Sequence, residues 1–147
     1  TNDAEAAIVI DFGTATTLTA VNNKGNFLGG MITLGLTKTF QALHYSTAQL
    51  PELSVQELEN LSLSSPLAFD TQTAIERGCV IGHIGMVRYW LERALKSLPN
   101  KTTVVATGGL ARLIAPAIKL FDHVDINLTL KGIKIIGEAA ADQADRA

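Results

Sequence analysis

The chain has 147 residues, 47% of them hydrophobic, and its mean hydropathy is +0.23, so we expect one globular domain with a packed core. A net charge of −2 without basic clusters argues against nucleic-acid binding, and no apolar run reaches the roughly 18 to 20 residues that span a bilayer. The single cysteine, Cys79, excludes an internal disulfide, and we expect a cytoplasmic protein. Because Thr1 is neither Met nor the start of a signal-like segment, we interpret it as a start inside a longer protein.

Three antiparallel strands are predicted at the beginning of the chain. Residues 6–11 form an apolar run without alternation, which is typical of a strand buried on both faces. Residues 16–21 alternate roughly, and the turn at residues 22–25 predicts a hairpin with a partner strand over residues 26–33. Two helices are predicted next, over residues 36–46 and, more briefly, over residues 55–61.

The longest predicted helix covers residues 71–97, with Asp70 as its N-cap. Gly78, Gly82 and Gly85 lie nearly on one line of this helix. Each glycine costs about 1 kcal/mol relative to alanine. We therefore interpret the line as a surface where another backbone packs closely, such as a second subunit; a helix broken near Gly82 is the alternative.

The second half of the chain alternates strands and helices. The predicted elements are a strand over residues 102–106, a helix over 110–120, a strand over 124–130 and a helix over 136–144. The complete order favours an α/β fold with a mixed sheet, three antiparallel strands followed by parallel ones, flanked by helices. This is the order of a ribonuclease H-like domain of the actin, sugar kinase and Hsp70 superfamily, and residues 1–147 would form one such domain.

Two segments share a design in which a buried strand leads into glycine and hydroxyl residues. Glycine lets a ligand approach the backbone, while threonine offers a hydroxyl and an N–H group to phosphate oxygens. Two such turns at the ends of strands in one sheet are typical of a nucleotide site. The residues concerned are Asp11, Gly13, Thr14, Thr16 and Thr17 in the first segment and Thr107, Gly108 and Gly109 in the second.

Each of these candidates has a structural alternative. Asp11 is either a cation ligand near phosphates or a strand-end cap for neighbouring N–H groups. The Thr107–Gly109 turn either binds nucleotide or only connects a strand to a helix. Thr71 by itself indicates only the start of a helix, and Trp90 is expected in the core. The three histidines show no metal-ligand spacing and are expected to be packing or surface residues, namely His44, His83 and His123.

Taken together, these segments resemble the C-terminal half of the type III pantothenate kinases, the Bvg accessory factor-like family. The Ile10–Thr17 segment resembles the second phosphate motif of the family, and Ala106–Leu110 its adenosine motif. Asp70–Gly78 matches the threonine-and-glycine stretch of the family. The similarity extends over nearly the whole chain in family order, including Leu28–Ile32 and Ala48–Pro51.

The resemblance implies ATP-dependent phosphorylation of pantothenate, the first step of coenzyme A synthesis. It implies a homodimer that needs Mg²⁺ and a monovalent cation, potassium or ammonium. Asp11 would bind the monovalent cation, and Thr71 would contact pantothenate at the dimer interface. ATP would be bound by Gly13, Thr14, Thr16, Thr107, Gly108 and Gly109.

The chain also departs from the family pattern. Leu34 replaces a frequent proline, and Asp70 replaces a frequent asparagine. The first phosphate loop of the family, and the aspartate that accepts the hydroxyl proton, would both lie before Thr1. We therefore expect no catalytic base here and no kinase activity from this chain alone; the N-terminal lobe would come from the same gene or from a partner chain.

Other functions remain open from the sequence. A non-enzymatic nucleotide-binding regulator of the same fold is the main alternative. An actin-like or Hsp70-like switch, or another sugar kinase, would need a longer chain. Ribonuclease H chemistry is disfavoured because only Asp11 occupies a strand-end carboxylate position, whereas two-metal sites need several.

Overall fold

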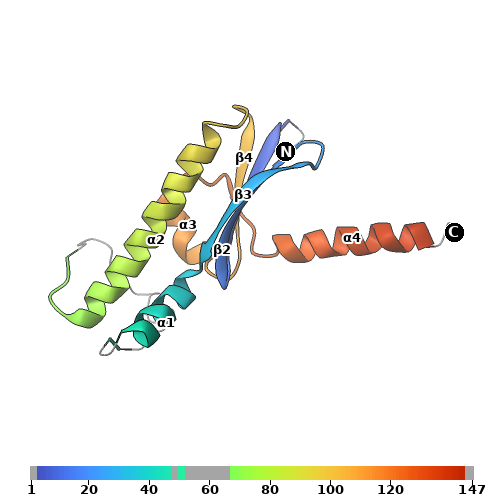
Figure 1. The fold of residues 1–147 in the computed structure, drawn as a ribbon. Coiled ribbons are helices and arrows are strands. Elements are labelled where there is room, and N and C mark those ends of the chain that lie inside the picture. Colours follow the sequence, from blue (N-terminus) through green and yellow to red (C-terminus); the bar gives the residue numbers. More distant parts are fainter. Residues whose placement is uncertain (1–2, 48–49, 52–66, 145–147) are drawn as a thin grey trace.

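The computed structural model describes residues 3–47, 50–51 and 67–144, and the short helix predicted over residues 55–61 lies outside them. Its centre is a five-stranded sheet in the order β3-β2-β1-β4-β5 (Figure 1). β1 pairs with β2 and β2 with β3 in antiparallel fashion, whereas β1–β4 and β4–β5 are parallel. The predicted α/β fold with a mixed sheet is confirmed. The strands are β1 (Ala6–Phe12), β2 (Ala15–Asn22), β3 (Phe27–Leu34), β4 (Thr102–Thr107) and β5 (His123–Val124).

One face of the sheet forms the hydrophobic core. Ile8, Ile10 and Phe12 alternate inward along β1 and are almost completely buried. They pack in one cluster with residues of three helices, α1 (Leu36–Ser46), α2 (Thr71–Leu95) and α3 (Ala111–Ile118). These helices lie to one side of the sheet in Figure 1. The side chains of the other face are therefore free of this cluster.

The first two helices agree closely with their predictions. α1 has the predicted bounds and buries Leu36 and Phe40. α2 starts at the predicted residue, because the Asp70 side chain accepts a hydrogen bond of 2.8 Å from the Thr73 N–H group, and it ends two residues early. It is continuous through Gly82, so the alternative of a break there is wrong. Trp90 packs half-buried against the core, as predicted.

The prediction for the C-terminal region is wrong in one element. The strand expected over residues 124–130 is reduced to β5, and a single helix, α4 (Leu128–Ala144), replaces the rest of it and the helix expected from residue 136. Asp125 initiates this helix, since its carboxylate accepts a hydrogen bond from Asn127 N and its carbonyl one from Leu128 N. The alternation of Leu128, Thr129 and Leu130 mimics a strand but is the first turn of a helix.

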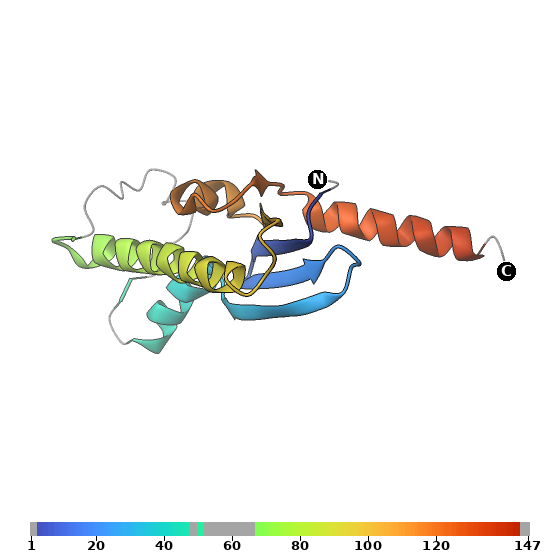
Figure 2. The ribbon, with the colours of Figure 1, turned by 90° about the horizontal axis from the view of Figure 1, so that it is seen from above.

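α4 extends away from the sheet in both ribbon views (Figures 1 and 2). Its side chains are largely exposed, including Leu130, Ile133 and Ile136 at 62–71%. In the parts of the chain that the structure describes, neither α4 nor any other helix is long and apolar enough to cross a bilayer.

Candidate nucleotide site

The turn between β1 and β2 is very tight. Phe12 and Thr16 are paired across it, and the Gly13 N–H group donates a hydrogen bond of 3.1 Å to the Ala15 carbonyl, so that Thr14 alone forms an exposed tip. The Gly35 N–H group binds the Thr14 carbonyl at 2.9 Å. A Cβ atom on Gly35 would overlap the carbonyl oxygen of Gly13, so only glycine allows this close support of the turn. The three residues 13–15 are called the phosphate loop below.

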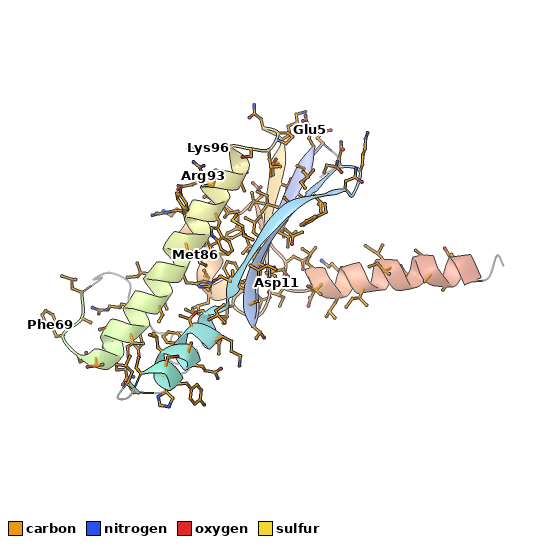
Figure 3. All side chains as sticks on the ribbon, viewed as in Figure 1. Glu5, Asp11, Phe69, Met86, Arg93 and Lys96 are labelled. Atoms are coloured by element: carbon orange, nitrogen blue, oxygen red, sulfur yellow. The ribbon has the colours of Figure 1, made fainter. Side chains whose placement is uncertain are left out.

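The second predicted loop lies directly beside the first. Asp11 and Thr107 are register partners in the parallel β1–β4 pair, and both stand where their strands end. Gly108 has a φ of +92°, and a Cβ atom there would overlap Asp11 Oδ1 and lie 2.6 Å from Phe12 N. Leu110 N donates to the Phe12 carbonyl at 3.3 Å. The two loops that the sequence singles out therefore meet at one edge of the sheet, around the Asp11 carboxylate labelled in Figure 3.

Thr107 carries an unpaired polar atom. The residue is 1% exposed, and its Oγ1 has no hydrogen-bond partner among the described residues. Leaving a buried hydroxyl unpaired costs about 1–3 kcal/mol. Because Thr107 is also the register partner of Asp11, its hydroxyl is a candidate for ligand contact.

The oxygen ligands at this edge suit a cation that keeps much of its hydration shell. In the described ranges, no three His, Cys, Asp or Glu side chains are close enough together to form a metal site. Asp11 offers one carboxylate; Gly13 and Gly108 lie close to it, and Thr107 is its register partner on β4. One carboxylate plus neutral oxygens, completed by water and phosphate, fits Mg²⁺ or a monovalent ion and does not fit a structural zinc site.

Thr16 is placed differently from Thr14. Its side chain is 1% exposed and lies on the core face of β2, where Oγ1 is 3.0 Å from Nε2 of His83 on α2. The hydroxyl is thus engaged by the core, and contact of Thr16 with ATP stays a prediction. Gly109 is exposed, and no atom of the described residues lies within 4 Å of a Cβ position built on it, which leaves room beside the helix that begins at Ala111.

His83 is the residue whose importance sequence reasoning missed. It is buried, and burial lowers the pKa of its imidazole from the ordinary value of 6.5, so the ring is neutral at pH 7. Its spacing of four from Val87, and of eight from Leu91, places it on the buried side of α2. This helical spacing was the signal in the sequence that His83 is buried. Its hydrogen-bond partner on β2, Thr16, could not be identified without the fold.

Thr71 lies apart from the other candidates. It is the exposed first residue of α2, next to the Asp70 cap, whose pKa is lowered mainly by the hydrogen bond from Thr73 N–H. Figure 3 shows Phe69, at this end of the helix, well separated from Asp11. The described chain therefore does not bring Thr71 to the Asp11–Thr107 edge.

A fold match of low sequence identity comes from one solved structure. A Campylobacter jejuni protein described as a "conserved putative Baf family transcriptional activator" superposes with a TM-score of 0.53 and 21% identity, over 95% of this chain and 60% of its own. This similarity supports the fold and nothing further.

Sequence comparison gives the family. The family model described as type III pantothenate kinase matches residues 1–93. The type III pantothenate kinase of Methylacidiphilum infernorum (isolate V4) is 44% identical over 134 residues, 90% of this chain and 48% of that protein. The enzyme of Syntrophobacter fumaroxidans is 41% identical over 133 residues, 90% of this chain and 50% of that protein. The chain spans about half the length of these relatives, and it belongs to the type III pantothenate kinase family.

Proposed function

We propose that this chain supplies the nucleotide-binding lobe of an enzyme that phosphorylates pantothenate with ATP, giving 4′-phosphopantothenate for coenzyme A synthesis. The observation that carries the proposal is the convergence of two glycine-containing loops around Asp11, whose register partner Thr107 has a buried hydroxyl with no hydrogen-bond partner among the described residues. Family membership supports the choice of substrate. Thr14 and Gly109 are exposed residues, and their backbone N–H groups would offer donors to phosphate oxygens and to the nucleoside, respectively.

The chemistry expected of this lobe is positional. Asp11 would hold a monovalent cation, potassium or ammonium, and Mg²⁺ bound with ATP would neutralise the phosphates. Gly13 and Thr14 would orient the phosphates, while Thr107, Gly108 and Gly109 would bind the adenosine end. No residue of the described lobe is assigned as the base, so the chain by itself is expected to be inactive.

We propose further that the active protein is a homodimer in which α2 faces a second subunit. Gly78, Gly82 and Gly85 lie on the side of α2 opposite Val80 and Val87, and a Cβ atom on any of the three glycines would have no described atom within 4 Å. A flat, open stripe of this kind permits close helix approach. It also extends toward Thr71, which would reach pantothenate held at the subunit boundary.

The dimer is tested by Gly82→Leu in the full-length protein, measured by sedimentation equilibrium. A bulky side chain on the stripe should shift the protein toward monomer. Arg88→Leu, on an exposed flank of the same helix, is the matched control and should leave association unchanged. Equal association of both variants would reject this surface.

A second lobe is the remaining partner that we propose, on the same gene or on a separate chain. The chain covers about half the length of its relatives, and α4 presents exposed Leu130, Ile133 and Ile136 with little to bury them. Side chains of this size normally pack against another surface. We infer that α4 contacts the other lobe.

The decisive experiment is a turnover assay of the full-length protein with ATP, Mg²⁺, potassium and pantothenate, with 4′-phosphopantothenate detected by mass spectrometry. Product that depends on both ATP and pantothenate supports the kinase. Binding of ATP without phosphorylated product would instead favour a non-enzymatic nucleotide-binding regulator of the same fold.

A further inference from the structure

His83 and Thr16 join two elements that are distant in the sequence. Their side chains meet inside the core at 3.0 Å, although the two residues are 67 positions apart along the chain. Both residues are buried, at 7% and 1% exposure. Because water cannot replace either partner there, the bond is a persistent link between α2 and the start of β2.

The position of Thr16 makes this link relevant to the phosphate loop. Thr16 is the register partner of Phe12, and the loop consists of the three residues between them. His83 also lies against the Phe12 ring, with 6.3 Å between ring centroids and 53° between ring planes. A single imidazole therefore contacts the residue on each side of the loop.

We propose that His83 is a positioning residue that holds the phosphate loop in the geometry required for ATP, acting through Thr16. This inference rests on the proposed function of the loop. The hydrogen bond fixes the rotamer of Thr16, and with it the start of β2 next to Thr14, so the phosphate-binding N–H groups are preorganised before ATP arrives. The neutral imidazole can serve as donor or acceptor toward the hydroxyl, depending on its tautomer.

The same bond couples the two substrate regions. His83 is twelve positions after Thr71 on α2, about 18 Å along the helix axis. α2 begins at Thr71, the residue proposed to contact pantothenate. Through His83 the same helix is hydrogen-bonded to Thr16, which directly follows the proposed phosphate loop. Gly35 supports the loop from its carbonyl side, and His83 supports its strand from the core side.

The test compares variants of the full-length protein by steady-state kinetics and thermal unfolding. His83→Leu removes the bond while filling the same apolar space, and it should raise KM for MgATP about 5- to 10-fold, the size of effect expected for one lost hydrogen bond. The KM for pantothenate should change less than twofold. His83→Gln, whose amide can bond to Thr16, should recover most of the ATP affinity.

The control is Val87→Ala, one turn further along the buried face of α2. It creates a cavity and lowers stability but does not touch Thr16, so its KM for MgATP should match the wild type. If His83→Leu behaves as Val87→Ala does, with lower stability and unchanged KM for MgATP, the positioning role is wrong. If His83→Leu does not fold, His83→Gln and Thr16→Val are compared instead. A KM for MgATP that is raised in Thr16→Val but not in His83→Gln supports the positioning role, and equal KM values in the two variants reject it.

A double variant separates positioning from direct contact. Thr16→Val combined with His83→Leu should be no worse for ATP than either single change, because both remove the same bond. Additive losses would mean that Thr16 contacts ATP itself and would overturn the assignment. If the wild type does not phosphorylate pantothenate, the proposed function is wrong. Titration of MgATP into the same variants would still test whether His83 positions the phosphate loop.

Discussion

Asp11, in β1, and Gly108, which directly follows β4, are packed so closely that no further carbon atom fits between them. A Cβ atom on Gly108 would overlap the Asp11 carboxylate oxygen, and the φ of +92° at this glycine is one that other residues rarely adopt. The contact brings the ends of β1 and β4 together and sets the position of the Asp11 carboxylate, for which we propose a cation.

Gly108→Ala is expected to destabilise the protein by about 2–4 kcal/mol, since it combines an unfavourable backbone conformation with overlap against Asp11 and Phe12 N. Urea unfolding measures the change. Gly109→Ala is the matched control, because a Cβ atom there meets nothing within 4 Å and its φ is ordinary; it should change stability by less than about 0.5 kcal/mol. Similar losses in both variants would contradict the packing described here.

Thr107→Val should separate stability from function. Valine has the shape of threonine without the unpaired hydroxyl, so the free energy of unfolding should rise by about 1 kcal/mol. At the same time ATP affinity should fall about tenfold if the hydroxyl serves the ligand.

The contrasting variant is Thr39→Val, measured by urea unfolding and ATP titration alongside Thr107→Val. The Thr39 hydroxyl donates to the Gly35 carbonyl at 3.1 Å, so its removal should lower stability by about 1 kcal/mol. Destabilisation by Thr107→Val would show that its hydroxyl has a partner within the protein.

His83 should make stability depend on pH between about 5 and 7. Burial lowers the pKa of the folded-state imidazole, whereas the unfolded chain has the ordinary value near 6.5. Below pH 6.5 the unfolded state therefore binds more protons, and stability falls as the pH is lowered until the folded pKa is passed.

Urea unfolding at several pH values measures how the free energy of unfolding changes with pH. The range between about pH 5 and 7 lies above the pKa values of ordinary carboxylates. His83→Gln should remove most of the slope between pH 5 and 7. His123→Gln, at an exposed position, should retain it. A wild-type protein whose stability is flat across this range would exclude a buried neutral His83.

Ile133→Lys combined with Ile136→Lys should leave the lobe itself intact, because both side chains are more than 60% exposed and such surface changes alter stability by about 0.5 kcal/mol at most. In the full-length protein the same pair should lower the melting temperature by several degrees if α4 contacts a second lobe. Lys134→Ala on the same helix, with an exposed side chain, is the control. Equal melting temperatures for the double variant and the wild type would exclude this contact.

Local sequence pattern predicted some elements well and others poorly. The hairpin and α1 were found because alternation, a glycine turn and helical spacing are properties of neighbouring residues. The first half of α4 was missed because Leu128 to Leu130 alternate like a strand; the hydrogen bonds that the Asp125 and Asn127 carbonyls accept from Leu128 N and Lys131 N belong to a helix start. Short apolar runs do not distinguish the two structures by periodicity.

The amino-acid sequence alone established that both loops contain glycine and threonine. These residue types matter because they decide how closely a ligand can approach the backbone and which groups can bind phosphate. Tertiary structure alone decided that Asp11 pairs in register with Thr107, that the Thr107 hydroxyl is buried with no partner in the described ranges and that Thr16 bonds to His83. These are relations between atoms far apart in the chain, and they exist only once strand pairing and the packing of α2 have set the distances.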